Sequence, residues 1–306
     1  MANRLTIVGA PSSAGAYAPG QEQAPAAVRA IRFLEMLAKR GVRIHDRGDV
    51  LGFRWRPDKA NPRAMNARNV AAVAQALSKQ VAAALAEDDK VLVLGGDCTV
   101  ELGTVAGALR DTTRVGLVYI DLDTDLNTPE STRDGALDWM GVAHLLGIQG
   151  SLSELAGLGP RAPMLAPDQL LFFANDNVEP FERDVIARLG IDQVPLADVA
   201  RDPTLAADAV VHGWARRFER LLVHVDVDVL DYVDTPLAEN TRRNWGLRCD
   251  QLMQTLKSLL SAPNWTALTI CELNPNHGES DGMTLRRFCE SLADALAQAP
   301  RLRSVA

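Results

Sequence analysis

The sequence predicts an α/β fold of three layers, in which helices cover both faces of a central, mainly parallel sheet. Apolar β-branched segments alternate with helical segments along almost the whole chain, a pattern typical of parallel strands joined by right-handed crossovers. Four of the apolar segments end abruptly in acidic residues, as buried strands do where they pass into polar loops. A chain of 306 residues is within the reach of one large α/β domain, so we expect residues 1–306 to form a single domain.

The elements follow from the periodicity of apolar residues and from the positions of Pro and Gly. Strands are expected at residues 5–9, 42–45, 91–94, 115–120, 169–173, 193–195, 221–229 and 265–273. Helices are expected at residues 24–40, 67–86, 139–146, 181–189, 205–220, 250–261 and 283–297, and a further helix after Asp97. Residues 47–65 and 147–168 contain Gly and Pro without a clear period, so we expect two long loops there.

Charge and cysteine content exclude several classes of partner. The formal net charge is −7 and no run of Lys and Arg stands out, which argues against a nucleic-acid partner. The apolar run at residues 5–11 is too short for a signal sequence or a membrane span, so we expect no membrane association. The four cysteines have no CxxC spacing, which is typical of reduced thiols in the cytoplasm rather than of a disulfide framework.

The most informative feature is a set of carboxylates at the ends of predicted strands. In an open parallel sheet, ligands bind beyond the carboxyl ends of the strands, so several strands that end in acids predict one acidic pocket. In DLDTD and DVD the acids alternate along the chain, and they project to the same side if the chain stays extended. The residues expected to meet in the pocket are Asp97, Asp121, Asp123, Asp125, Asp226, Asp228 and Glu272.

So many carboxylates in one pocket require compensation of their charge. Two like charges about 4 Å apart repel by about 4 kcal/mol at an effective dielectric constant of about 20. Three kinds of compensation are open: bound cations, arginines from elsewhere in the chain, and raised pKa values that leave some acids protonated. The alternate spacing of the acids suits two adjacent divalent ions that share carboxylate ligands.

Seven segments resemble the ureohydrolase superfamily, which contains the arginases and agmatinases. They follow one another in the order of that family over nearly the whole chain, and they read VGAPSSAG, DRGDV, GGDCT, DLDTDLNTP, DNVEP, HVDVDVLD and CELNP. The resemblance implies a three-layer α/β/α fold, hydrolysis at a guanidino carbon with release of urea or a urea analogue, and usually a pair of manganese ions. It also implies a homo-oligomer, because arginase-like proteins are commonly trimers or hexamers.

The resemblance also implies where metal ligands lie. Four positions agree with the family pattern, namely Asp121, Asp125, Asp226 and Asp228. Two further ligand positions, Cys98 and Asp123, have replaced histidines of the family. Oxygen ligands favour hard ions such as Mn²⁺ and a thiolate favours softer ones, so the two replacements act in opposite directions. We expect one or two divalent ions, Mn²⁺ by resemblance with other divalent metals left open, and we favour one strong site over two.

Residues around the substrate are implied in the same way. Glu272 matches a glutamate that faces the guanidinium, and Asp138 stands where arginases have a histidine for proton transfer. Asn127 matches a residue that holds the α-carboxylate, and Glu179 would face the α-ammonium group. Asp134 replaces a serine that shares the α-carboxylate contact, and its charge would repel that group. The implied substrate is an amino acid with a guanidino-like tail, such as arginine or N-hydroxyarginine.

Some of these side chains also have a purely structural interpretation. Cys98 in isolation would more often be a small buried side chain than a ligand, but its position among acids reverses that preference. His224 either lies under the site as a hydrogen-bond partner or is an ordinary core histidine. Asp97 is expected to cap the helix that follows it. Trp139 and Trp245 are expected to serve packing.

Two functions of different classes remain open from the sequence. The first is a metal-dependent hydrolase of guanidino compounds, which the retained aspartates and Glu272 favour. The second is a metal-free descendant of the fold that binds a cationic amino acid as a sensor or regulatory subunit. The loss of the family's histidines favours this second function, in which the ligand and protonation would neutralise the acids.

Overall fold

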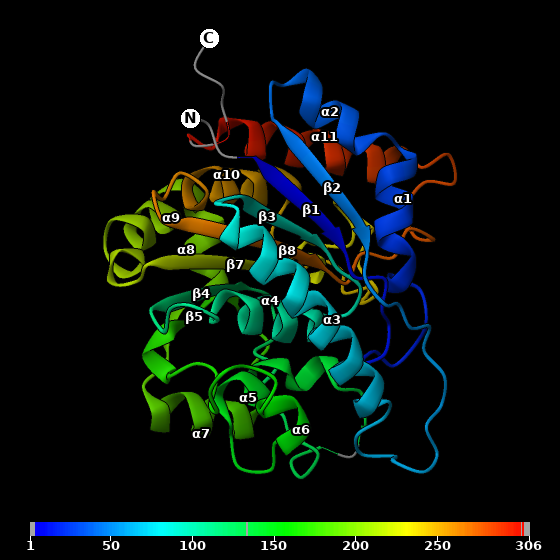
Figure 1. Ribbon diagram of the computed structural model, residues 1–306, viewed down its shortest axis with the longest axis vertical. Coiled ribbons are helices and arrows are strands. Elements are labelled where there is room, and N and C mark those ends of the chain that lie inside the picture. The colour runs from blue at the N-terminus through cyan, green and yellow to red at the C-terminus, as the bar shows by residue number, and fades with distance from the viewer. Residues whose placement is uncertain (1–3, 133, 301, 303–306) are drawn as a thin grey trace.

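The computed structural model describes residues 4–132, 134–300 and 302, which contain one sheet of eight strands (Figure 1). All neighbouring strands pair in parallel, in the order β2-β1-β3-β8-β7-β4-β5-β6. The predicted α/β class is therefore confirmed. The strands are β1 (Leu5–Gly9), β2 (Ile44–Asp49), β3 (Lys90–Leu94), β4 (Val115–Ile120), β5 (Leu170–Asn175), β6 (Asp192–Pro195), β7 (Arg220–Asp226) and β8 (Trp265–Cys271).

Helices cover both faces of the sheet, which gives the three layers (Figure 1). One face is covered by α1 (Ala24–Ala30), α2 (Phe33–Lys39), α8 (Leu196–Arg201), α9 (Pro203–His212), α10 (Cys249–Leu259) and α11 (Met283–Gln298). The other face is covered by α3 (Ala67–Ala86), α4 (Glu101–Ala108), α5 (Gly141–Leu146), α6 (Ser153–Ala156) and α7 (Pro180–Leu189). Within the described residues, no helix is both long and apolar enough to cross a membrane.

The central strands are buried on both faces, because successive residues of a strand point into different layers. In β3, Val91 and Val93 belong to the core under α3 and α4, whereas Leu92 and Leu94 belong to the core under α10 and α11. This double burial accounts for the uninterrupted apolar segments from which the strands were predicted.

Several boundaries differ from the prediction, each at a local feature of the backbone. The expected helix 24–40 is divided into α1 and α2, because Arg32 adopts a left-handed conformation with φ of 66°. The expected helix 205–220 ends at His212, after which residues 214–217 form a 3-10 turn. The expected strand 221–229 ends at Asp226. Helix α6 lies within the expected loop 147–168, and α8 has no counterpart in the prediction.

The order of the strands brings the acidic strand ends together. Strands β3, β8, β7 and β4, which lead into the acidic segments, are consecutive neighbours in the middle of the sheet. Backbone bonds continue beyond the strands, since Gly95 donates its N–H to Ile270 and Glu272 donates its N–H to Gly96, both over 2.8 Å. The sheet therefore fixes the relative positions of segments that are far apart in the chain.

The turn after β3 lies tightly against the segment that follows β1. Asp97 donates its N–H to the carbonyl oxygen of Ser12 over 2.9 Å. A Cβ atom on Gly96 would lie 1.7 Å from that same oxygen, so a side chain has no room there. The carboxylate of Asp97 accepts the N–H of Thr99 over 3.0 Å, which confirms the expected capping role.

We therefore expect Gly96→Ala to lower the free energy of unfolding by about 1–3 kcal/mol, the usual cost of overpacking a close-packed site. Urea denaturation of the metal-free protein measures the change. Gly141→Ala is the matched control, because Gly141 begins α5 with φ of −56° and its added Cβ would meet nothing closer than 3.8 Å. The control should unfold like the wild type or at higher urea. Unchanged stability of Gly96→Ala would contradict the close contact with Ser12.

Candidate active site

An acidic pocket lies at the carboxyl ends of β3, β8, β7 and β4. Its lining includes seven of the residues predicted from the sequence: Cys98, Asp123, Asp125, Asp138, Asp226, Asp228 and Glu272. Four further residues, which the sequence did not place in the pocket, also line it: Tyr17, Trp139, Glu239 and Asn240. Asp121 lies beside the pocket, with a carboxylate oxygen within 4.8 Å of the Cys98 sulfur and of an Asp125 oxygen. The predicted convergence at one edge of the sheet is thus present for these acids, whereas Asp97 does not line the pocket and its carboxylate instead accepts the N–H groups of Gly15 and Thr99.

The same local turn positions both DxD pairs. The carboxylate of Asp121 accepts the N–H of Asp123 over 2.7 Å, and the carboxylate of Asp226 accepts the N–H of Asp228 over 2.7 Å. An aspartate that bonds the N–H two residues ahead forms a turn that mimics a backbone turn. The chain is therefore not extended at these pairs, and the expected extended alternation is wrong. Turns after the strands, rather than alternation along them, aim these acids into the pocket.

Two further carboxylates are held on left-handed backbone. Asp125 has φ of 50° and Glu272 has φ of 60°, a conformation that costs energy in residues other than glycine. Tyr119 donates its hydroxyl to Asp125. The carboxylate of Glu272 accepts Nε2 of Gln21 over 2.8 Å and the N–H of Cys98 over 3.0 Å. Both acids are therefore fixed in place by hydrogen bonds.

Burial and mutual repulsion disfavour the charged forms of these acids. Burial, followed by the charge of Asp226, raises the pKa of Asp121 well above its usual value. Burial and the charge of Asp228 raise the pKa of Asp226 in the same way. Burial and the charge of Asp123 raise the pKa of Asp228 to about 7. Without an added cation, part of the cluster is therefore neutralised by protons, which was one of the three expected kinds of compensation.

Arg242 supplies a second kind of compensation. Its Nη1 lies 2.7 Å from Oδ2 of Asp123 and 3.9 Å from Oδ2 of Asp228, and its charge lowers the pKa of Asp228. The guanidinium lies over the ring of Trp245, with 5.4 Å between its Cζ and the ring centroid, and Nε1 of Trp245 donates a hydrogen bond to Asp176 over 2.6 Å. The sequence raised the possibility of an arginine but gave no sign of which one, because Arg242 lies in an irregular segment before α10.

Several groups of donor atoms in and beside the pocket could hold a cation, and two of them are built mainly from the predicted aspartates. One group joins Cys98, Asp121 and Asp125, and another joins Asp121, Asp123 and Asp228, with the ligand atoms of each group within 4.8 Å of one another. Oδ2 of Asp121 and Oδ1 of Asp228 are buried and have no hydrogen-bond partner among the described residues. Such unpaired oxygens are what a hard divalent ion requires. At the second position, however, the guanidinium of Arg242 already faces two of the three carboxylates.

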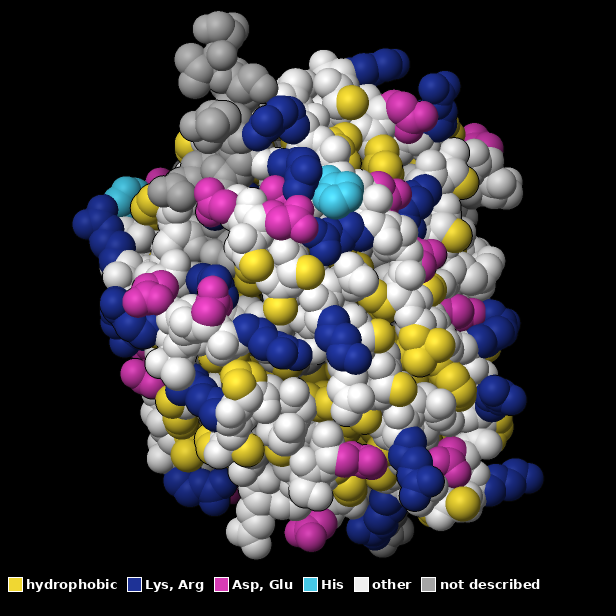
Figure 2. All heavy atoms as spheres, in the orientation of Figure 1, with side chains coloured by type: hydrophobic (Ala, Val, Ile, Leu, Met, Phe, Trp, Pro, Cys, Tyr) yellow, Lys and Arg dark blue, Asp and Glu magenta, His cyan; other side chains and the backbone are white. Residues whose placement is uncertain are grey.

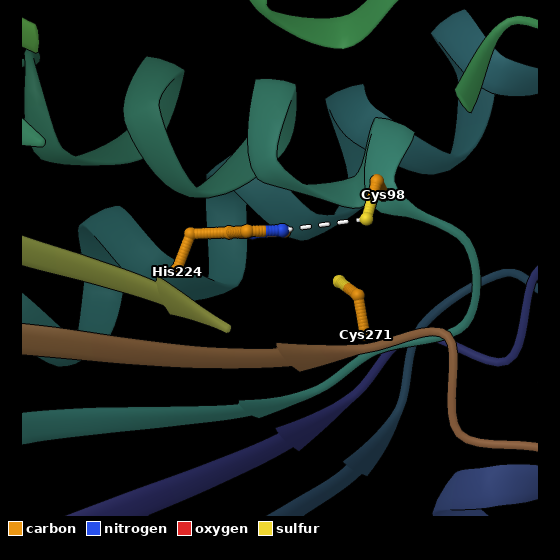
Figure 3. A group of neighbouring side chains, drawn as sticks. All are labelled: Cys98, His224 and Cys271. Atoms are coloured by element: carbon orange, nitrogen blue, oxygen red, sulfur yellow. Dashed lines mark hydrogen bonds between the residues drawn. The ribbon is translucent and has the colours of Figure 1, made fainter. Parts of the chain in front are cut away.

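His224 lies beneath Cys98 and is fully buried (Figure 3). Its Nε2 lies 3.3 Å from the sulfur of Cys98, and its Nδ1 lies 3.3 Å from a carboxylate oxygen of Glu101. The imidazole ring also stacks on Tyr119, with ring centroids 4.1 Å apart and planes 1° from parallel. His224 is therefore a direct partner of a pocket residue rather than an isolated core histidine.

Three of the residues expected around an amino-acid substrate, Asn127, Asp134 and Glu179, are not part of the lining of the acidic pocket. Nδ2 of Asn127 lies 3.4 Å from a carboxylate oxygen of Glu179, so these two residues are neighbours. Asp134 is exposed and accepts the N–H of Ala136 over 3.0 Å. Asp138 lines the pocket itself, and burial followed by the charge of Glu272 raises its pKa well above its usual value.

The raised pKa values predict an unusual dependence of stability on pH. An acid whose pKa is higher in the folded state binds more protons when folded, so stability falls as pH rises between its unfolded and folded pKa values. For Asp228 this window runs from 3.8 to about 7. In the presence of a chelator, we expect the free energy of unfolding to fall by about 1–4 kcal/mol across this window, as measured by urea denaturation.

Asp228→Asn should flatten this dependence, whereas Asp184→Asn, on the exposed surface of α7, should not. Addition of a divalent cation should restore stability most strongly near neutral pH, where the acids must lose their protons. A metal-free protein that becomes more stable as pH rises through this range would contradict the charge balance described above.

Comparisons with known proteins agree with this geometry. The Arginase family model matches residues 3–297. Human arginase-1 is 26% identical over 296 residues, which are 96% of this chain and 92% of that protein. The arginase structure from Bacillus caldovelox has a TM-score of 0.85 at 22% identity, covering 99% of this chain and 100% of that one. Arginase from Entamoeba histolytica in complex with L-ornithine has a TM-score of 0.85 at 21% identity, covering 95% of this chain and 99% of that one. The chain therefore belongs to the arginase family.

Proposed function

We propose that this protein is a divalent-metal-dependent hydrolase that cleaves a C–N bond of a guanidino group in arginine or an arginine-like amino acid. The products would be urea, or a urea analogue from a substrate such as N-hydroxyarginine, and the remaining amine. The observation that carries the proposal is the convergence of buried carboxylates with raised pKa values in a member of the arginase family. Such a pocket is stabilised by cations, and both a metal ion and a guanidinium are cations.

One metal position is better supplied with ligands than the other. Cys98, Asp121 and Asp125 would hold a divalent ion, with Asp226 next to Cys98 at 3.1 Å between sulfur and oxygen. We propose Mn²⁺ there, because most of these ligands are oxygens. When bound, a divalent cation lowers the pKa of water and so supplies a nucleophile near neutral pH. Asp121 and Asp125 would hold the ion in the pocket.

Arg242 would take the place of a second ion. Its positive charge lies against Asp123 and Asp228, two of the three carboxylates that an ion at the other position would need. A divalent ion there would lie close to the guanidinium and be repelled by its charge, so the two compete for one position. We therefore propose a single Mn²⁺ per chain.

The substrate would be recognised by charge at one end and by hydrogen bonds at the other. Glu272, fixed by Gln21 and by the backbone of Cys98, would pair with the guanidinium. Asp138 would give a proton to the leaving amine, because burial and the charge of Glu272 raise its pKa and favour its protonated form. We propose that Asn127 and Glu179 contact the α-carboxylate and α-ammonium groups. The E. histolytica relative was solved with L-ornithine, an amino acid, which supports an amino-acid substrate here.

A binding protein without metal is the alternative function. The observation in its favour is that Arg242 and protonation already neutralise part of the acidic cluster. A cationic amino acid beside Glu272 would then complete the charge balance.

On the face shown in Figure 2, Lys and Arg side chains are interspersed with acidic and apolar ones, without an extended basic patch over the described residues. This face therefore offers no feature of a nucleic-acid surface.

A urea assay over guanidino compounds with Mn²⁺, Co²⁺ and Ni²⁺ tests the proposed hydrolysis. We expect Mn²⁺-dependent release of urea from an amino-acid substrate. Glu272→Gln should lower kcat/KM by about 10–100-fold, since a charged hydrogen bond contributes about 1.5–3 kcal/mol. Glu154→Gln, on exposed surface in α6, is the control and should be fully active. If no compound is hydrolysed with any of the metals, while arginine binds the metal-free protein by calorimetry, the binding function replaces the proposed one.

The single-ion proposal predicts the effect of removing Arg242. Arg242→Gln frees Asp123 and Asp228, so we expect the bound Mn²⁺ to rise from one ion to two per chain in equilibrium dialysis. Arg243→Gln is the matched control, because the neighbouring Arg243 is exposed and stacks on Tyr232 instead. The control should bind Mn²⁺ as the wild type does. Equal stoichiometry for Arg242→Gln and the wild type would show that Arg242 does not occupy an ion position.

A further inference from the structure

A group of three soft metal-ligand side chains lies at the bottom of the acidic pocket. Cys98 follows β3, His224 lies on β7 and Cys271 ends β8, so three neighbouring segments of the sheet contribute one side chain each. Their ligand atoms all lie within 4.8 Å of one another, and all three residues are buried. Figure 3 shows the two sulfur atoms and the imidazole nitrogen pointing toward a common centre.

The spacing of these atoms suits ligands of one zinc ion. Ligands of zinc at about 2.3 Å for sulfur and about 2.0 Å for nitrogen lie about 3.5 Å apart in a tetrahedral site. Nε2 of His224 lies 3.3 Å from the sulfur of Cys98, and the sulfur of Cys271 lies within 4.8 Å of both atoms.

Glu101 fixes the imidazole in the orientation that a ligand needs. A carboxylate accepts hydrogen bonds, so its contact with Nδ1 of His224 at 3.3 Å places the proton on Nδ1 and leaves the lone pair of Nε2 facing Cys98. Metal-bound histidines almost always donate their other nitrogen to a carboxylate or carbonyl in this way. Glu101 is buried at 2% exposure at the start of α4, and its other oxygen has no hydrogen-bond partner among the described residues. Stacking on Tyr119 prevents rotation of the ring.

We propose that Cys98, His224 and Cys271 form a binding site for a thiophilic divalent cation of the Zn²⁺ class. Two sulfurs and one imidazole select zinc over manganese, which prefers oxygen ligands. The site is distinct from the oxygen-rich position of Asp121 and Asp125, and the two positions have Cys98 in common. Cys98 lines the pocket, so an ion enters from the pocket. This proposal concerns binding and does not depend on the proposed hydrolysis.

Cobalt spectroscopy of the full chain tests the proposal. The protein is stripped of metal and titrated with Co²⁺, which gives an intense near-ultraviolet charge-transfer band when thiolates bind it, and Zn²⁺ is then added as competitor. We expect one Co²⁺ per chain with the thiolate band, displaced by Zn²⁺ but not by equimolar Mn²⁺. Cys271→Ser and Cys271→Ala should lose the greater part of the band. Glu101→Gln should weaken Zn²⁺ binding by about 10–100-fold, the usual effect of removing a partner of a metal-bound histidine.

Cys289→Ser is the matched control, because Cys289 is equally buried in α11 but lies in the core on the other face of the sheet. It should keep the full band. Two independent substitutions at Cys271, each checked by its urea unfolding curve, keep the test valid if one of them folds poorly. Absence of a thiolate band in the wild type, or an unchanged band in folded Cys271 variants, would overturn the proposal. Mn²⁺-dependent urea release without the band would refute the zinc site alone, and the band without urea release would refute the hydrolysis alone.

Discussion

The balance of charge in the acidic pocket is the constraint on which the rest of the site depends. Burial and mutual repulsion raise the pKa values of Asp121, Asp226 and Glu272, so the protein without a cation holds protons there. The other polar contacts of the pocket either offset the negative charge or hold the acids in place. Arg242 lies against two of the acids, and hydrogen bonds from Tyr119 and Gln21 hold two others. A pocket arranged like this has affinity for cations before any particular substrate is considered.

The fold creates this concentration of charge by its strand order. Strands β3, β8, β7 and β4 are neighbours in space although β3 and β8 are separated by most of the chain. Turns then direct the side chains, because Asp121 and Asp226 each bond the N–H two residues ahead. The left-handed backbone of Asp125 and Glu272 is unfavourable in free energy. The packing of the core on both faces of the sheet stabilises the fold enough to hold these two residues in that conformation.

Much of the fold and the acidic pocket could be predicted from the sequence, because the signals are local. Apolar runs that end in Asp or Glu mark strand ends, and the parallel sheet aligns those ends. The rest depends on contacts between distant segments. Arg242 could not be identified, since an irregular segment has no period that shows where a side chain points. The partnership of His224 with Cys271 requires β7 and β8 to be adjacent, and the sequence does not state the strand order.

The surroundings of Asp123 and Cys98, the two positions at which the resemblance implies replaced histidines, differ in charge. At Asp123, Arg242 adds the opposite charge at 2.7 Å, so that end of the pocket is balanced within the protein. At Cys98 the neighbours are Cys271, His224 and Asp226, and no Arg or Lys among the described residues forms an ion pair with Asp226. A thiolate there can be balanced only by an added cation or kept as a thiol by a proton. The two ends of the pocket therefore differ in what balances their charge: an arginine of the protein at Asp123, and a proton or an added cation at Cys98.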